Sequence, residues 1–144
     1  RIELAKAYHK PIIVHNRKAT EDVYNILKLE DISDIGGIMH CYNSSLDMAF
    51  KFFKLGMLIG VSGVITFKNT KLGEVIKEIP LEYIVLETDS PYLTPETYRG
   101  IKNEPQFIEL VAQKIAELKQ IEYRLVVEQT HQNASRLFAL NNTI

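Results

Sequence analysis

The chain has one cysteine, no tryptophan and almost no net charge, with 17 Lys and Arg against 18 Asp and Glu. A lone Cys41 cannot form an intramolecular disulfide, which favours a reducing, cytoplasmic location. The balance of charges excludes a broadly basic surface, so an anionic substrate must be met by local cations or by a metal. No apolar run approaches the roughly 20 residues of a membrane span, so no membrane partner is expected. What is present, 46% hydrophobic and 24% charged residues, is typical of a globular domain.

Short apolar runs alternate with helical patterns along the whole chain. The sequence predicts strands that end at His15, His40, Val61 and Glu87, with helices over 20–30, 47–55 and 72–78 between them. Two more helices are predicted at 105–119 and 122–138. This alternation is typical of a parallel sheet with right-handed crossovers. We expect one α/β domain, whole or partial, over residues 1–144.

Three of these runs end in residues that bind metals: PIIVH at His15, GGIMH at His40 and YIVLETD at Asp89. His15 shares a strand face with Ile13, His40 shares one with Ile38, and Asp89 shares one with Val85 and Glu87. Because parallel strands meet at one edge, the three side chains should converge. Imidazole suits Zn, Mn or Ni, and a carboxylate suits harder ions as well. Such an ion would activate water for hydrolysis. The alternative for each histidine is an ordinary hydrogen-bonded surface residue. Glu87, one layer below Asp89, is expected either to support a ligand histidine or to form a structural ion pair.

A long loop over 88–104 follows the last predicted strand, and loops of this length in compact domains are usually functional. Arg17, two residues after His15, is a candidate phosphate contact, as are Arg99, Lys102 and Asn103 of the loop. Solvated loop residues are the alternative for each. Strand alternation places Cys41 on the face opposite its neighbour His40, which argues against a Cys–His nucleophile.

The chain resembles the TatD family of metal-dependent deoxyribonucleases in six motifs: PIIVHNRKA, IMHCYNSS, GVSGVITFKN, VLETDSPYLTP, RGIKNEP and the final TxxNASRLF. The resemblance implies a TIM-like (β/α)8 barrel of the metallo-dependent hydrolase, or amidohydrolase-like, type. In that family a His-x-His pair lies on the first strand, a Glu on the fourth, a His on the fifth and on the sixth, and an Asp on the eighth. His15, His40 and Asp89 match the last three positions, so the chain is expected to be the C-terminal half of such a barrel, strands five to eight. The His-x-His pair is absent, and HCYNSS departs from the usual family run after this histidine.

The resemblance implies metal-dependent hydrolysis of phosphodiester bonds in DNA, with 3'–5' exonuclease action as one expectation. It implies His15, His40 and Asp89 as ligands of a divalent metal (Mg, Mn or Zn), with two ions in the complete protein. Asp89 and Glu87 are then the catalytic carboxylates, and Arg17, Arg99 and Asn103 bind the substrate. Two alternatives stay open: a metal-dependent ester or amide hydrolase, such as a D-aminoacyl-tRNA deacylase, and a catalytically inactive fragment.

A half barrel would expose two strand edges and an apolar face. We therefore expect it to associate with another chain, such as a second copy of itself, or to be part of a longer protein. The chain opens with Arg1 rather than Met, which favours a truncated sequence.

Overall fold

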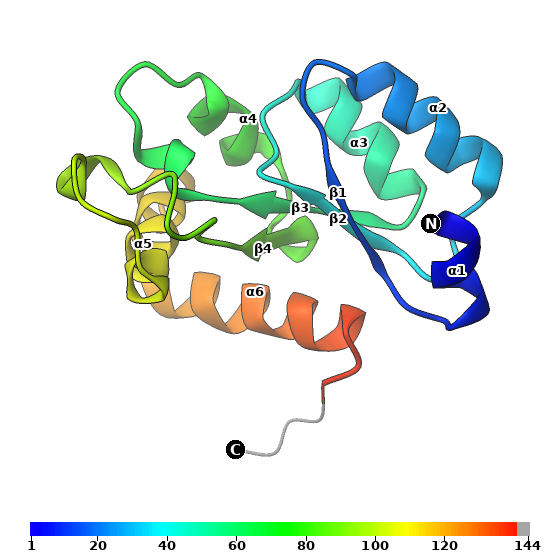
Figure 1. The fold of residues 1–144 in the computed structure, drawn as a ribbon. Helices are drawn as coiled ribbons and strands as arrows, with labels where there is room; N and C mark the ends of the chain where they lie inside the picture. The colour runs from blue at the N-terminus through cyan, green and yellow to red at the C-terminus, as the bar shows by residue number, and fades with distance from the viewer. Residues whose placement is uncertain (141–144) are drawn as a thin grey trace.

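The computed structural model describes residues 1–140 and contains a four-stranded parallel sheet with helices on both faces (Figure 1). The strands lie in the sheet in chain order: β1 (Ile12–His15), β2 (Gly37–His40), β3 (Met57–Val61) and β4 (Ile84–Leu86). The α-helices are α1 (Ile2–Ala7), α2 (Thr20–Glu30), α3 (Leu46–Lys54), α4 (Leu72–Glu78), α5 (Ile108–Lys119) and α6 (Tyr123–Leu137). Short 3-10 turns lie at η1 (Gly63–Thr66), η2 (Leu81–Tyr83), η3 (Glu96–Tyr98) and η4 (Pro105–Phe107). The predicted α/β class and parallel sheet are confirmed.

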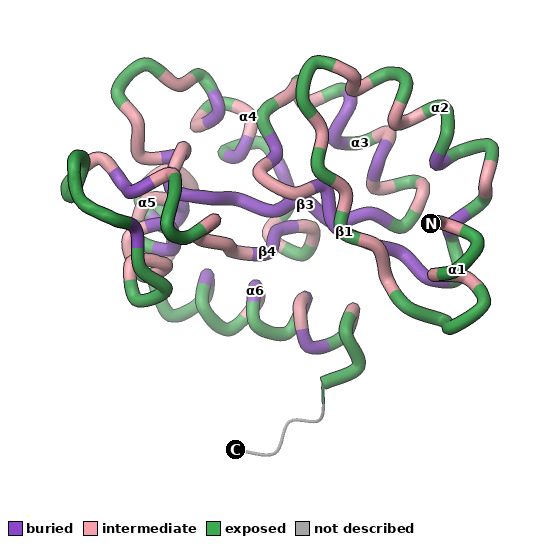
Figure 2. The backbone as a smooth tube through the Cα atoms, in the orientation of Figure 1, coloured by how far each residue is buried: buried purple, intermediate pink, exposed green. Residues whose placement is uncertain are grey.

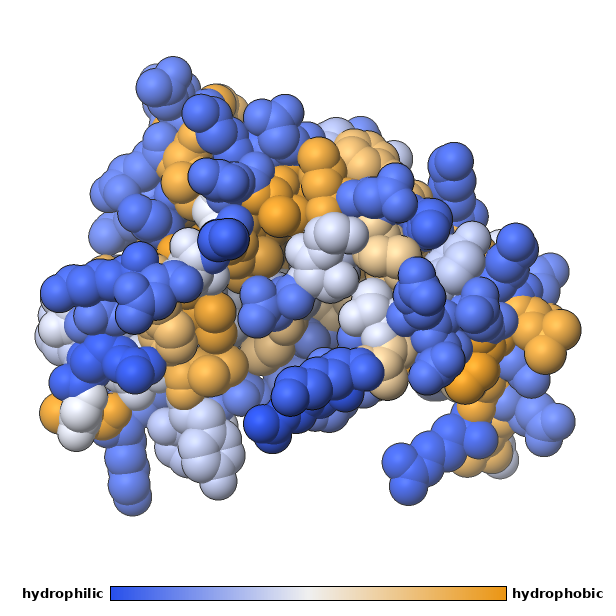
Figure 3. Space-filling view, turned by 90° about the horizontal axis from the view of Figure 1, so that it is seen from above, coloured by the Kyte–Doolittle hydropathy of each residue, from blue (hydrophilic) through white to orange (hydrophobic). Residues whose placement is uncertain are grey.

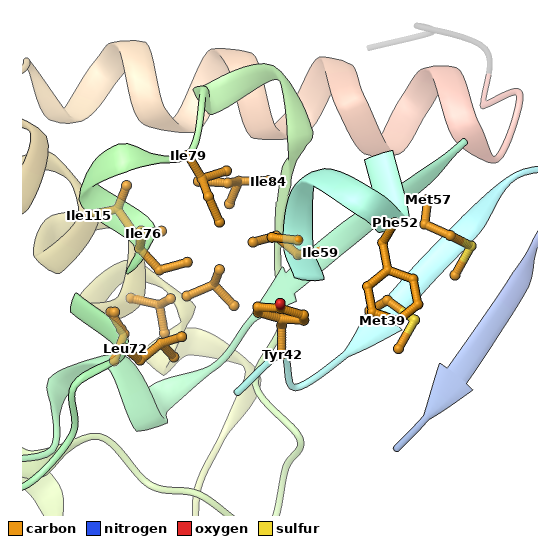
Figure 4. Packing of buried hydrophobic residues seen from close by; sticks show 14 of the residues in the cluster. Met39, Tyr42, Phe52, Met57, Ile59, Leu72, Ile76, Ile79, Ile84 and Ile115 are labelled. Atoms are coloured by element: carbon orange, nitrogen blue, oxygen red, sulfur yellow. The ribbon is translucent and has the colours of Figure 1, made fainter. Parts of the chain in front are cut away.

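The larger hydrophobic core lies on one face of the sheet, beneath α2 to α5 (Figures 2 and 4). Met39, Ile59 and Ile84 project from three neighbouring strands and are at most 2% exposed. Phe52 of α3 and Ile76 of α4 are fully buried in the same cluster. Each buried side chain of this size stabilises the fold by about 1.5–3 kcal/mol. This core holds the four strands in register, and thereby fixes where their carboxyl ends lie.

The opposite face of the sheet carries a smaller apolar cluster that α6 covers (Figure 1). Ile38, Leu58 and Val85, the second residues of β2, β3 and β4, pack against Ala134 and Leu137 of the helix. Ile38 and Leu58, which are paired with each other, lie toward the amino ends of their strands, and Val85 is paired with Gly60 further along β3. We call this face the inner face; its other end, at the carboxyl ends of the strands, carries the polar residues described below.

Strand β1 forms one edge of the sheet, and its inner face is open. Ile13 is 62% exposed, and His15, two residues later on the same face, is also exposed. Elsewhere the surface is mostly hydrophilic with apolar side chains gathered in patches, as Figure 3 shows for one side. Among residues 1–140, no helix is both long and apolar enough to cross a membrane.

Candidate metal centre

Two histidines lie side by side at the carboxyl ends of β1 and β2. The parallel register pairs His15 with His40, and both side chains belong to the inner face of the sheet. Their ring centroids are 6.0 Å apart, and their planes are inclined by 42°. The structure therefore brings together the two histidines that the sequence pattern placed at one edge.

His40 is held between the two carboxylates that follow β4. Its Nδ1 lies 2.9 Å from Oε2 of Glu87, and its Nε2 lies 3.0 Å from Oδ1 of Asp89. The side chains are partly buried, at 23% exposure for His40, 18% for Glu87 and 33% for Asp89. Burial acts to lower the pKa of His40, but the hydrogen bonds and negative charges of the two carboxylates outweigh it and raise the pKa above its ordinary value. The surroundings of this imidazole therefore favour positive charge.

Glu87 is fixed on both of its oxygens. While Oε2 faces His40, Oε1 accepts a hydrogen bond from the backbone N–H of Cys41. The carboxylate lies over Gly60 of β3: a Cβ on that glycine would be 2.7 Å from Cδ of Glu87, closer than real Cβ contacts permit. The predicted role of Glu87 as a support for a ligand histidine agrees with these contacts.

The backbone adopts the left-handed conformation at two residues of the site, directly after β2 and at the candidate ligand Asp89. Cys41 has φ 47° and Asp89 has φ 57°. Such values are uncommon outside glycine, and they cluster at sites where the surrounding contacts over-determine the chain. Here the Cys41 amide is held by Glu87, and the carbonyl of Asp89 accepts a hydrogen bond from Tyr92 N–H at 2.9 Å.

The prediction that Cys41 points away from His40 is wrong. Ligand-type atoms of His40, Cys41 and Glu87 lie within 4.8 Å of one another. Strand alternation does not extend to Cys41, because β2 ends at His40 and the chain turns there. Burial, with hydrogen bonding and charge from Glu87, raises the pKa of the thiol to about 12. A protonated thiol is a poor ligand and a poor nucleophile, so the conclusion against a Cys–His nucleophile stands on this different ground.

His15, His40 and Asp89 fit a divalent cation. An imidazole nitrogen of His40 and a carboxylate oxygen of Asp89 face each other across 3.0 Å, and the His15 ring lies beside them. Imidazole and carboxylate together suit Zn or Mn, and the carboxylate also suits Mg. Three protein ligands would leave coordination positions for water and substrate, as in catalytic zinc sites. Glu87 is the weaker candidate as a ligand, because both of its oxygens already have partners.

A hollow of about 360 Å³ opens beside His40. Its walls come from the segments after β1 and β2: Asn16, Arg17, Lys18, Thr20, Met39, His40, Cys41, Tyr42, Asn43 and Ser44. The lining includes two cations and no carboxylate. Arg17, predicted to contact phosphate, is exposed and lies in this wall. Asn16 braces the wall, since its amide donates to Thr20 Oγ1 at 2.9 Å and its Oδ1 accepts from Ala19 N–H at 3.2 Å.

The structure gives Asn103 a different role from the predicted substrate contact. The residue is only 4% exposed. Its Nδ2 donates to the carbonyls of Thr88 and Tyr92 at 2.7 and 2.6 Å, and its Oδ1 accepts from Glu104 N–H at 2.9 Å. With every polar group of the amide in use, Asn103 holds the two ends of the 88–104 loop together. The geometry gives no support to a direct contact with substrate.

Arg99 and Lys102, the other loop candidates, are exposed. The guanidinium carbon of Arg99 lies 4.4 Å from the centroid of the Phe67 ring, a cation–π contact that occupies one face of the side chain. Neither residue lines the hollow beside His40. Their role as phosphate contacts stays a prediction.

Sequence patterns missed Gly60 and the Cys41 amide, which together seat Glu87. A glycine inside a strand often marks a close approach by another group, so the glycine in the predicted strand MLIGV could have indicated the role of Gly60. No sequence pattern could have indicated the Cys41 amide, because a backbone N–H is common to nearly all residues.

Comparison with known proteins places these residues in a family. The family model described as "TatD related DNase" matches residues 1–139. Among curated relatives, "Uncharacterized metal-dependent hydrolase YabD" of Bacillus subtilis is 47% identical over 141 residues, which cover 97% of this chain and 55% of the relative. "Uncharacterized metal-dependent hydrolase TatD" of Mycobacterium tuberculosis is 37% identical over 140 residues, with 96% and 53% covered. The chain spans about half the length of the curated relatives it matches.

Solved structures show the same fold. YjjV, a TatD homologue from Escherichia coli K12, matches with a TM-score of 0.91 at 31% identity, over 97% of this chain and 54% of that one. A TatD family hydrolase from Entamoeba histolytica matches with a TM-score of 0.82 at 23% identity, over 95% and 54%. The α/β fold with its parallel sheet is therefore that of the corresponding part of TatD-like structures.

Proposed function

We propose that this chain, which belongs to the TatD-related DNase family, carries part of the active site of a metal-dependent hydrolase that cleaves phosphodiester bonds in nucleic acid. The proposal is carried by one observation: a histidine and an aspartate at neighbouring strand ends face each other across 3.0 Å, beside a second histidine. The names of the relatives, metal-dependent hydrolases, support the reaction class. The family description and the cations beside the site support DNA as the substrate.

His15, His40 and Asp89 would hold a divalent metal, for which Mg, Mn and Zn are the candidates, and the complete site would hold two ions. When bound, the metal supplies Lewis-acid activation of water and of a phosphoryl oxygen. Asp89 could also act on the attacking water, since its carboxylate lies on the inner face beyond the carboxyl end of β4 and is one-third exposed. It would orient the attacking water and accept its proton.

The hollow beside His40 would receive the phosphate backbone of the substrate. Arg17 and Lys18 offer positive charge there, and the side chains of Asn43 and Ser44 offer neutral donors. The absence of carboxylates from the lining favours an anion. This local cluster supplies the charge that the overall composition lacks.

The four strands would correspond to the fifth to eighth strands of a complete (β/α)8 barrel. The length match supports this, because the chain covers about half of each relative. The open inner face of β1, with Ile13 62% exposed, is where another segment or chain would complete the barrel. We expect either a second copy of this chain or additional polypeptide to do so.

Hydrolysis of single-stranded DNA with Mn²⁺ tests the proposal. The parent chain is compared with Asp89→Asn and with Asp34→Asn, an exposed aspartate near the opposite end of the sheet. We expect Asp89→Asn to lose both turnover and Mn²⁺ binding and Asp34→Asn to retain both. Hydrolysis of an aminoacyl ester but not of DNA would favour the deacylase alternative. Mn²⁺ binding unaffected by Asp89→Asn would refute the proposed site.

A further inference from the structure

We infer that Glu87, seated over Gly60, is a positioning residue that sets the His40 imidazole for metal binding. The inference rests on the proposed function, and it assigns roles to two residues that do not themselves contact the metal. Three strands take part: β2 supplies His40, β3 supplies the space at Gly60, and the segment after β4 supplies the carboxylate.

The first step is the direction of the His40 ring. An ionised carboxylate can only accept hydrogen bonds, so Nδ1 of His40, 2.9 Å from Glu87, must carry a proton. By the same rule Nε2, 3.0 Å from the Asp89 carboxylate, donates to Asp89 as long as it keeps its proton; a metal that replaced that proton would meet the Nε2 lone pair, because Glu87 keeps the other proton on Nδ1. Nε2 is the atom that faces Asp89. Glu87 thus directs the lone pair of His40 toward the second protein ligand, as carboxylate–histidine pairs do in metal sites.

The second step is the restraint on Glu87 itself. A carboxylate with one partner can rotate, but Glu87 has a partner on each oxygen, His40 on one and the Cys41 N–H on the other. The Cys41 amide is available because the chain turns left-handed immediately after β2, at φ 47°. The same turn ends the strand at His40 and supplies the donor that fixes the carboxylate against it.

The third step is the space beneath the carboxylate. Gly60 is a buried residue in the middle of the sheet, paired with Val85 of β4, and its φ is not in the left-handed region. Backbone conformation therefore does not require glycine here. What requires it is the carboxyl group of Glu87, whose Cδ lies 2.7 Å from the position that a Cβ would take. Any larger residue would push the carboxylate off His40.

A purely structural role accounts poorly for this arrangement. Partly buried ion pairs stabilise folds weakly, and apolar replacements of similar volume are often as stable. A glycine inside a strand also weakens the strand. The presence of Gly60 beneath Glu87 is explained if the two residues together orient the His40 ring.

The test is Mn²⁺ affinity, measured by isothermal titration calorimetry on the chain and two variants. Glu87→Gln keeps the shape but can satisfy only one of the two donors, and Gly60→Ala displaces the carboxylate without changing charge. We expect each to weaken Mn²⁺ binding by about 10–100-fold, the usual effect of losing such an outer partner. Matched controls are Glu82→Gln, an exposed glutamate of η2, and Gly73→Ala of α4, whose added methyl meets only the flexible Leu118 side chain. Both controls should bind as the parent does.

A spectroscopic signature separates positioning from general stability. With Zn²⁺ bound, ¹⁵N NMR of the parent should show His40 protonated at Nδ1 and ligated at Nε2, and Glu87→Gln should lose that pattern with its far-UV circular dichroism unchanged. Parent-like Mn²⁺ affinity in Glu87→Gln, while Asp89→Asn abolishes binding, would overturn this inference and leave the metal site standing. A parent chain that takes up no Mn²⁺ would overturn the metal site, and the inference with it.

Discussion

Replacing Asn103 by alanine should destabilise the protein without removing any group that touches substrate or metal. The amide makes three hydrogen bonds at 2.6–2.9 Å from a residue that is 4% exposed. A net contribution of about 0.5–1.5 kcal/mol for each bond gives about 1.5–4.5 kcal/mol. Water can reach part of the loop once the amide is gone, so we expect the lower part of this range, about 2 kcal/mol. For a chain of this size that lowers the Tm by about 7 °C.

The decisive comparison is Asn103→Asp. The aspartate keeps the oxygen that accepts from Glu104 N–H, but it places a second oxygen against the carbonyls of Thr88 and Tyr92. Repulsion should make it less stable than Asn103→Ala, although aspartate is closer to asparagine in size. Asn69→Ala, at an exposed position before α4, should change the free energy of unfolding by less than about 0.5 kcal/mol.

Urea unfolding followed by circular dichroism measures all three variants, and Mn²⁺ titration measures the consequence for the site. Because Thr88 precedes Asp89, loosening the loop should also weaken metal binding. If Asn103→Ala costs under 0.5 kcal/mol, or if Asn103→Asp is the more stable variant, the assignment of Asn103 as the residue that closes the loop is refuted. A contact between Asn103 and the substrate would then be tested by the effect of Asn103→Ala on KM for single-stranded DNA.

Four further outcomes are expected from the same structure. Phe52→Ala, at a fully buried position, should lower the free energy of unfolding by about 3–5 kcal/mol in urea melts. Asn133→Ala removes two hydrogen bonds from α6 to the backbone carbonyls of Leu81 and Ile84. It should lower the free energy of unfolding by about 2 kcal/mol, detected as a lower Tm. Arg17→Ala should raise KM for single-stranded DNA more than it lowers kcat, with Arg17→Lys partly restoring KM; an unchanged KM would remove Arg17 from the substrate path. Light scattering should show a mass above 16.5 kDa if chains associate, and Ile13→Asp should reduce it.

The parts of the fold that could be predicted are those that local patterns determine. Each strand was placed to within a few residues, because β-branched runs and their flanking glycines and prolines act over short distances. The convergence of His15 and His40 at one edge is predictable from the period of two and from the parallel sheet, whereas their direct pairing in the register is a result of the structure. Residues 105–107 were expected in the helix but form the 3-10 turn η4, a difference confined to one turn.

The parts that could not be predicted depend on contacts distant in sequence. Asn103 lies 15 residues from Thr88, and no short pattern distinguishes an amide that closes a loop from one that waits for substrate. The alternation rule predicts the wrong side for Cys41, because β2 ends at His40 and the rule does not hold one residue beyond the strand. Gly60 acquires its meaning only when Glu87, 27 residues later, is seen to lie on it.

The three candidate ligands are not equally prepared for a metal, and the difference indicates where the proposed site would take further ligands. His40 and Asp89 hold each other, and Glu87 holds His40 from behind. His15 is exposed, and it lies on the edge strand beside the uncovered Ile13. Strands β2 and β3 are paired on both sides, so additional strands can join only at β1 or β4. A segment that joined at β1 would bring its own inner-face side chains next to His15, where the proposed two-ion site would take its further ligands. The contacts that would close the sheet and the contacts that would complete the metal site therefore fall on the same strand edge, and we expect the two to form together.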